Sequence, residues 1–198
     1  MTVQEFRKKV KPFVKLSIDN KDFLVEEVVK FRFDPVRKAE KSRLFDHSKN
    51  SELKLNVNSS SSEIYKKEIL EDGLSNGVDD GSFYIKCFLS DNYVFADDLE
   101  NNMFLLVKEV KTLFVQPFAK ELEFDAKEFK FLFSAHAVAE EVMGKEILKK
   151  GYAERFWDYK SEDDSYLSLG IEDDSGKRLD FYGKIFDNNT VVIHDNTL

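Results

Sequence analysis

Few residues in this chain are of types that could carry chemistry. The histidines are His47, His136 and His194, and their spacing matches no metal-binding motif. His136 and Glu140 are four residues apart, which on a helix would place them on one face as half of a metal site. His194 follows the apolar run 191–193 at an expected strand end, where a histidine could act in catalysis, but no partner nucleophile is recognisable.

Paired aspartates are the other candidates for chemistry. Two adjacent carboxylates can hold calcium or transfer protons, yet each pair here lies in an expected turn beside a strand, where aspartate side chains stabilise the turn itself. None fits the twelve-residue calcium loop. We therefore interpret the pairs as turn residues; they are Asp79–Asp80, Asp97–Asp98, Asp163–Asp164 and Asp173–Asp174.

Motifs for cofactors and for covalent catalysis are missing from the sequence. It contains neither a glycine-rich phosphate loop nor a nucleophile elbow. The single cysteine, Cys87, lies in the apolar run 83–89, which favours a buried, inert thiol and rules out both a disulfide within the chain and a multi-cysteine zinc site. We expect no cofactor and no metal, and the sequence favours a protein that is not an enzyme.

Charge and hydropathy limit the partners and the compartment. The 198-residue chain carries a net charge of -8, whereas proteins that bind phosphate backbones usually have a basic surplus. Residues 1–50 nevertheless contain 13 Lys and Arg against 8 Asp and Glu. No apolar run has the length of a signal peptide core or a membrane span. These features predict a cytoplasmic protein that does not insert into membranes.

The basic end of the chain holds the predicted interaction surface. From Lys30 to Arg43 cations alternate with aromatic residues, a pattern that can bind single-stranded nucleic acid. On a strand, Phe31 and Phe33 would point inward and leave only the cations outside. We therefore expect these cations to contact an anionic protein partner; the candidate surface is Arg37, Lys38, Lys41 and Arg43.

Hydrophobic periodicity predicts an α+β fold of mostly antiparallel strands, arranged as a meandering sheet or a partly closed barrel. Thr2 and Glu5 form a potential capping box for a short N-terminal helix, and 13–33 reads as a β-hairpin. Segment 134–150 predicts one long helix, because its apolar residues recur at three- and four-residue spacing. The predicted division is a β-rich half, 1–117, with a polar insert at 36–81, and a second half, 118–198, of the helix and four strands.

The stretch from Tyr152 to Asp195 is the clearest structural signal. It reads as four short strands, at 153–159, 165–171, 178–185 and 190–193, that form an antiparallel meander with acidic turns. Its aromatic residues suggest either a buried cluster or a groove for a partner. The candidate aromatic groove consists of Trp157, Tyr159 and Tyr182.

The same stretch resembles an uncharacterised bacterial family of β-rich domains, some of whose members sit beside phage-shock-type stress genes. The likeness rests on aromatic and glycine positions over about the last 55 residues: Gly144, Gly151, Tyr152, 155–159, 167–169 and 180–184. The long polar insert departs from the family's compact form. The resemblance implies no activity and no catalytic residues.

Three functions remain open from the sequence. The first is a non-enzymatic module that binds another macromolecule, most plausibly a protein, through the basic end or the acidic rim. The second is a small-ligand binder or weak hydrolase with a cleft near His136 or His194. The third is nucleic-acid binding through Lys30–Arg43. The sequence does not identify a partner, a substrate or an oligomeric state.

Overall fold

The computed structural model describes residues 1–33, 83–98, 102–112 and 119–194. Within these ranges the chain forms one α-helix, two short 3-10 helices and eleven β-strands. In chain order they are α1 (Val3–Lys9), β1 (Lys15–Ile18), β2 (Lys21–Phe33), β3 (Phe83–Leu89), η3 (Ser90–Asn92), β4 (Tyr93–Asp98), β5 (Met103–Val110), β6 (Glu121–Phe124), β7 (Lys127–Gly144), β8 (Ala153–Lys160), β9 (Ser165–Glu172), β10 (Arg178–Asp187), η4 (Asn188–Thr190) and β11 (Val191–His194).

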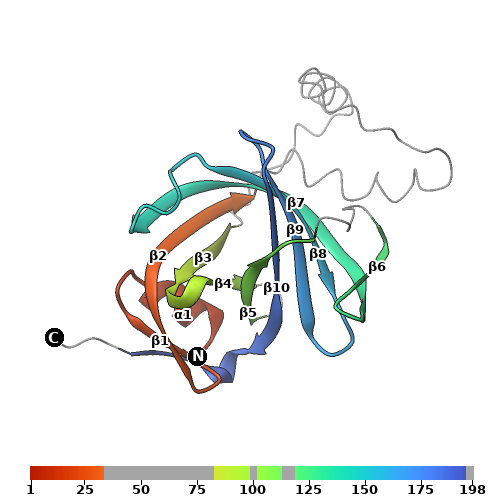
Figure 1. The fold of residues 1–198 in the computed structure, drawn as a ribbon. Helices are drawn as coiled ribbons and strands as arrows, with labels where there is room; N and C mark the ends of the chain where they lie inside the picture. The colour runs from red at the N-terminus through yellow and green to blue at the C-terminus, as the bar shows by residue number, and fades with distance from the viewer. Residues whose placement is uncertain (34–82, 99–101, 113–118, 195–198) are drawn as a thin grey trace, which may run out of the picture.

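Eight of these strands close into an antiparallel barrel. They follow one another in the order β2-β3-β4-β5-β10-β9-β8-β7, and β7 pairs back with β2. The closing register runs from Glu27 opposite Gly144 to Phe33 opposite Ala137. Figure 1 shows the long β7 curving over the barrel to lie beside β2. Strands from both predicted halves of the chain build this one barrel.

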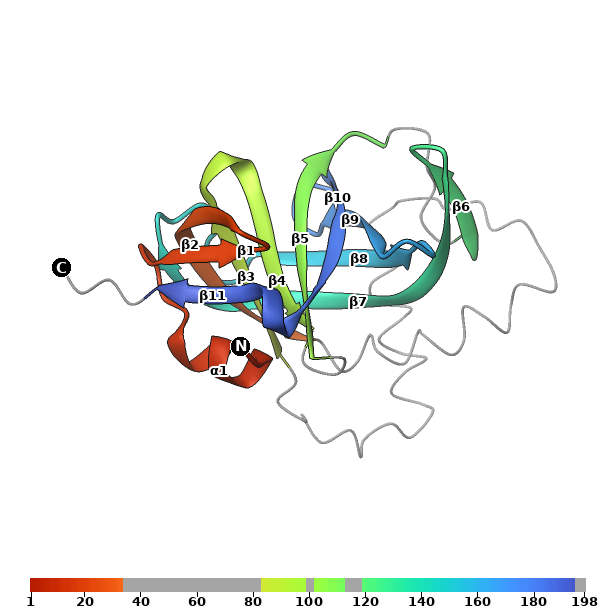
Figure 2. The same ribbon diagram turned by 90° about the horizontal axis from the view of Figure 1, so that it is seen from below.

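The elements α1, β1 and β11 cover the outside of the barrel at one side. β1 pairs with both β2 and β11, and α1 lies outside the strands near this pair (Figure 2). Val3 and Phe6 of α1 pack on Phe95 and Phe104, while Arg7 Nε donates to Asp97 Oδ2 over 2.5 Å. No helix in the described part of the chain is long and apolar enough to cross a membrane.

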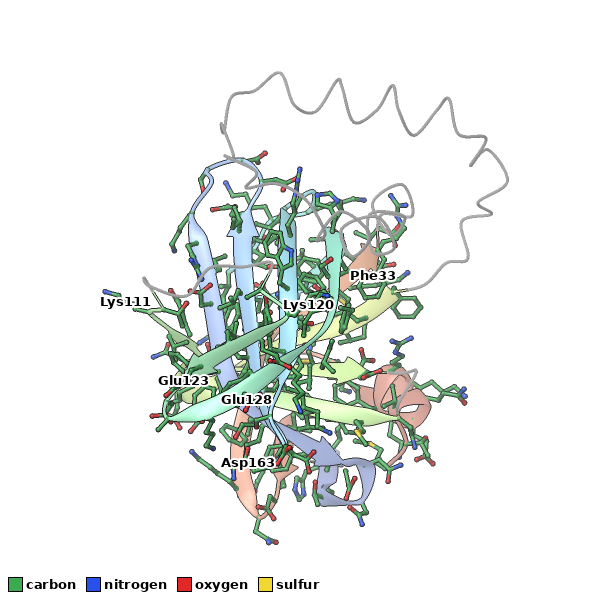
Figure 3. The ribbon with its side chains drawn as sticks, turned by 90° about the vertical axis from the view of Figure 1, so that its right-hand side faces the viewer. Phe33, Lys111, Lys120, Glu123, Glu128 and Asp163 are labelled. Carbon is green, nitrogen blue, oxygen red and sulfur yellow. The ribbon has the colours of Figure 1, made fainter. Side chains whose placement is uncertain are left out.

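A second outer cluster lies under the hairpin formed by β6 and β7. Figure 3 shows this hairpin, marked by Glu123 and Glu128, crossing the outer face of the neighbouring strands. The hairpin supplies Leu122, Phe124, Phe129 and Phe131. They pack against the outward-facing side chains of β8, β9 and β10, so that this face of the barrel is shielded from water.

The lumen, by which we mean the barrel interior, receives every second side chain of each barrel strand. In β3, Tyr84, Lys86 and Phe88 point into it, whereas Cys87 belongs to the outer core. Much of the lumen is aromatic, but the lumen-facing residues of β7 include three alanines beside Phe133 and Val142. The apolar residues of this part of the lumen are Val29, Phe31, Tyr84, Phe88, Phe133, Ala135, Ala137, Ala139 and Phe156.

The predicted long helix at 134–150 is wrong, and so is the α+β class that depended on it. Most of the segment is the second part of β7. A β-bulge explains the misleading periodicity: Phe31 pairs with Ala139 and Lys30 pairs with Glu141, so that one β7 residue is extra. The lumen-facing series therefore jumps from Ala139 to Val142, which is a helix-like step of three inside a strand.

Most of the short elements were predicted correctly. The capping box of Thr2 and Glu5 is confirmed, as are the β1–β2 hairpin and the strands of the stretch from Tyr152 onward. The fourth of those strands does not continue the meander, however, because β11 pairs with β1 rather than with β10. The polar insert 36–81 lies outside the described residues.

Gly183 offers a test of this packing. Its lumen-facing position on β10 is so close to β5 that an added Cβ would lie 2.0 Å from the carbonyl oxygen of Leu106. Alanine normally improves a strand relative to glycine by roughly 0.5–1 kcal/mol. We predict the reverse here: Gly183→Ala lowers the free energy of unfolding in urea by about 1–3 kcal/mol, because β5 and β10 must separate. The matched change at the exposed neighbour, Lys184→Ala, should alter it by less than about 0.5 kcal/mol, and a stabilised Gly183→Ala would contradict the close approach.

Candidate functional site

A buried ion pair spans the lumen between β3 and β8. Lys86 Nζ contacts Glu154 Oε1, and the two side chains are only 11% and 8% exposed. The ammonium also lies 4.8 Å from the ring centre of Phe31 and 5.6 Å from that of Phe181. A cation in such a place is stabilised by its carboxylate and by the aromatic faces together.

Two tyrosines complete the hydrogen bonds of Glu154. The Tyr84 hydroxyl donates to Oε1 over 2.9 Å, and the Tyr152 hydroxyl donates to Oε2 over 3.4 Å. Burial raises the pKa of the Tyr84 hydroxyl well above its usual value, and the charge of Glu154 adds to the effect. Tyr84 and Tyr152 therefore stay protonated and act as hydrogen-bond donors inside the barrel.

Asp158 is the second lumen carboxylate of β8 and is 3% exposed. The hydroxyls of Tyr166 and Ser168, on β9, donate hydrogen bonds to it, while Oδ1 is enclosed and finds no hydrogen-bond partner among the residues that the structure describes. Burial raises the pKa of Asp158 to about 7, against the opposing effects of these two hydroxyls and of Lys86. Its charge therefore changes near neutral pH.

Glu27 is a third buried carboxylate and is fully enclosed. It accepts hydrogen bonds from the backbone N–H groups of Ile147 and Leu148, the latter over 2.9 Å. These bonds tie the segment between β7 and β8 to β2 near one end of the barrel. Both carboxylate oxygens of Glu27 thus accept a hydrogen bond, whereas Asp158 Oδ1 accepts none from the described residues.

Part of the lumen's apolar lining keeps contact with water. Phe88, Phe181 and Ile185 pack against the buried residues Val94, Val107 and Tyr166, yet each is only partly buried. Phe133 and Ala135, on the opposite wall, are also partly exposed. These five lumen residues are thus less buried than Lys86, Glu154 and Asp158, which face the same interior.

A second polar cluster lies on the outer surface, where β1, β2 and β11 meet. The Ser17 hydroxyl lies 2.5 Å from Asp22 Oδ1 and 2.6 Å from His194 Nε2. Lys15 Nζ in turn contacts Asp22 Oδ2 at 2.6 Å. Ser17, Asp22 and His194 line an open surface pocket of about 520 Å³, and Asn20 and Thr190 also line it.

The predicted histidines have different surroundings. His194 is the one beside Ser17, a nucleophile that the sequence did not reveal because 177 positions separate the two. His136 is buried on the outer face of β7, where its Nε2 lies 2.7 Å from Asp173 Oδ2. No group of three or more metal-ligating side chains occurs within the described ranges.

The predicted aromatic groove residues lie in the outer cluster under the β6–β7 hairpin. Trp157 is 7% exposed and Tyr159 is fully buried, while Tyr182 packs against them at the margin. The predicted basic surface of Arg37, Lys38, Lys41 and Arg43 lies outside the described residues. Lys30 and Arg32, which belong to the same basic run, contact Glu140 and, for Lys30, also Glu141.

Sequence reasoning missed Lys86, Glu154 and Asp158. A signal was present, since Lys86 interrupts the apolar run 83–89 and Asp158 lies between Trp157 and Tyr159. A charged residue inside a strand that is apolar on both sides must be paired or have its pKa shifted when the strand is buried.

Comparison of the chain with protein-family models, with curated proteins and with solved structures finds no match. The resemblance to a bacterial family of β-rich domains therefore stays a prediction. Any proposal about function depends on the geometry of the barrel itself.

The pKa of Asp158 yields a prediction about stability. The folded state holds this proton up to about pH 7, whereas an unfolded aspartate loses it near pH 4. Between these values the folded state binds more protons, so its free energy of unfolding falls as the pH rises, by roughly 2–4 kcal/mol in total. Asp158→Asn should remove this part of the decline, so that the variant is more stable than the wild type at pH 8.

Urea unfolding from pH 4 to pH 8 measures the effect. Asp174→Asn, an exposed change in the β9–β10 turn, is the control and should follow the wild-type curve. The charged and titratable groups around Asp158 are Lys86, Glu154, Tyr166 and Tyr84, and all four remain in the variant. Parallel curves for the wild type and Asp158→Asn would contradict a raised pKa.

Proposed function

We propose that this protein binds one small, largely apolar ligand inside its barrel. The observation that carries the proposal is the lumen of the closed eight-stranded barrel, which combines partly exposed aromatic side chains with buried ionisable groups. A barrel of this size is either filled by its side chains or has room for one small ligand. Apolar walls with a few convergent polar groups are typical of ligand sites.

The buried charges support binding rather than a purely structural role. A buried ion pair such as Lys86–Glu154 is often no more stable than well-packed apolar residues of the same volume. Asp158 is worse for stability, because its ionised form is buried with one oxygen unpaired. Polar groups that lower the stability of a core are expected where a ligand uses them.

The small residues of β7 support the same proposal. Ala135, Ala137 and Ala139 pack beside the rings of Phe31 on β2 and Phe156 on β8, the two strands that flank β7. Larger aliphatic residues there would fill the interior and stabilise the fold by roughly 0.8 kcal/mol for each buried methylene. The alanine wall instead limits how much of the lumen the chain itself occupies.

A fluorescent probe tests the proposal. We expect the neutral probe N-phenyl-1-naphthylamine to show saturable, one-to-one fluorescence enhancement with the full chain. Ala135→Phe places a ring in the lumen and should weaken binding at least about tenfold, equal to about 1.4 kcal/mol. Leu132→Phe adds a ring at a position that is 43% exposed and should leave the affinity unchanged.

Circular dichroism establishes that both variants are folded before the titrations are compared. The proposal fails if the wild type gives no saturable signal. It fails equally if the folded Ala135→Phe variant binds as tightly as the wild type, since the probe would then occupy another site.

A second candidate function, slow hydrolysis, follows from the contact between Ser17 and His194. A hydroxyl within 2.6 Å of an imidazole nitrogen has the geometry of an activated nucleophile. Asp22 competes with His194, because a hydroxyl has one proton and can donate it to only one of them. The pocket also lacks, among its described residues, an evident buried donor set for an oxyanion, and for this reason we rank hydrolysis second.

An activated ester tests this candidate. We expect p-nitrophenyl acetate to be hydrolysed faster than by buffer, and both Ser17→Ala and His194→Ala to lower the rate by at least about tenfold, near the low end of the effect of a positioned base. Ser175→Ala, at another exposed serine, is the control. A rate that Ser17→Ala leaves unchanged would exclude hydrolysis at this pocket.

The other two functions stay predictions. Protein binding was predicted from basic residues that lie outside the described ranges. Nucleic-acid binding was predicted from the run Lys30–Arg43, of which Lys30 and Arg32 are paired with glutamates and Phe31 is buried in the lumen. The pairing reduces the positive potential that a phosphate backbone would need.

A further inference from the structure

The charge distribution inside the barrel defines the chemical class of its ligand. We propose that the lumen binds an organic cation: an apolar molecule with one ammonium group, which is held by Asp158. This inference rests on the proposed function and adds to it the sign of the ligand's charge and the residues that recognise it.

The first argument is the excess of carboxylates over cations. Among the described residues, the buried acidic and basic side chains that face the lumen are Glu27, Lys86, Glu154 and Asp158. Lys86 balances Glu154, and Glu27 is held by backbone N–H groups, so that Asp158 has no counter-ion of its own. A cation that enters would therefore reduce the electrostatic cost of the interior.

The second argument is the unpartnered oxygen. Asp158 is buried and faces the lumen, and its Oδ1 has no hydrogen-bond donor within the described ranges. Tyr166 and Ser168 already donate to this carboxylate, so the one missing interaction is a further donor. An ammonium group supplies both a donor and a charge, and a hydroxyl supplies only a donor. Because Oδ1 is enclosed, the ligand must displace part of the lining to reach it.

The third argument is the aromatic wall. The lumen already stabilises one ammonium, that of Lys86, against the rings of Phe31 and Phe181. Phe88 and Phe133 present partly exposed rings to the same interior. Aromatic faces attract organic cations and also pack on the apolar part of such a ligand. A carboxylate ligand would instead meet Glu154 and Asp158 as like charges.

A metal ion fits this lumen less well than an organic cation. Divalent ions need several oxygen, nitrogen or sulfur ligands around one point. The described residues contain no group of three or more such side chains within reach of one ion. The aromatic residues between the carboxylates offer surface for a ligand with carbon atoms.

Three probes of the same shape test the inference: benzylammonium, benzyl alcohol and benzoate. Isothermal titration calorimetry with the full chain at pH 8 should give the tightest binding for benzylammonium, at least about tenfold above benzyl alcohol, which corresponds to about 1.4 kcal/mol. Benzoate should bind most weakly. Asp158→Asn should reduce the preference for the ammonium over the alcohol by about tenfold, whereas Asp174→Asn should preserve it.

The pH dependence supplies an independent readout. With a pKa near 7 for Asp158, the ionised fraction rises about tenfold from pH 6 to pH 8, and the affinity for benzylammonium should rise in proportion. The affinity of Asp158→Asn should not depend on pH in this way. Lys86, Glu154, Tyr166 and Tyr84 surround the carboxyl in both proteins.

The outcomes separate this inference from the proposal on which it rests. If benzyl alcohol or benzoate binds as tightly as benzylammonium, and Ala135→Phe blocks it, the barrel binds ligands but does not select cations. If none of the three probes nor the neutral fluorescent probe binds, the proposed function fails as well. An ammonium preference that Asp158→Asn leaves intact would assign recognition to another residue and overturn the role of Asp158.

Discussion

The hydrogen bonds between β2 and β7 turn a curved sheet into a closed barrel. They join segments more than a hundred positions apart, from Glu27 opposite Gly144 to Phe33 opposite Ala137. Closure gives the lumen a wall on every side, which is why Lys86 on β3 and Glu154 on β8 face each other across it. It also removes the exposed edges that β2 and β7 would otherwise present along this stretch. Burial in this closed interior is what raises the pKa of Asp158.

Closure creates two chemical environments that differ in polarity. The outer face packs α1, β1 and the β6–β7 hairpin onto apolar side chains and is covered in the usual way of a globular core. The inner face carries Lys86, Glu154 and Asp158, and the low dielectric constant there makes each charge matter more than it would in water. Asp158 shows the effect most clearly, because burial raises its pKa to about 7 although two hydroxyls and Lys86 favour its ionised form. The structural role thus belongs to the outer clusters, and the proposed chemistry belongs to the lumen.

Local patterns in the sequence predicted the strands and the first helix, because each depends on neighbouring residues: the capping box at Thr2, the β1–β2 hairpin, and the alternation in β8 to β10. The second half of β7 was misread because a bulge at Glu140 changes which residues face inward, and because its inward residues include alanines where an ordinary strand has β-branched residues. Barrel closure could not be predicted, since no local signal encodes the β2–β7 register. The site could not be assembled for the same reason, although Lys86 within the run 83–89 marked one of its members.

The two candidate sites differ in how deeply their side chains are buried, and this difference decides which site is the stronger candidate for function. Ser17, Asp22 and His194 are exposed, so solvent screens their interactions and their positions cost the fold little. Such a cluster forms readily wherever polar residues meet at a sheet edge, and its geometry alone is weak evidence for catalysis. Lys86, Glu154 and Asp158 are buried, and their removal from water has a cost that exposed groups do not bear. The cost that the fold bears for these lumen groups is therefore the stronger indication of where function lies.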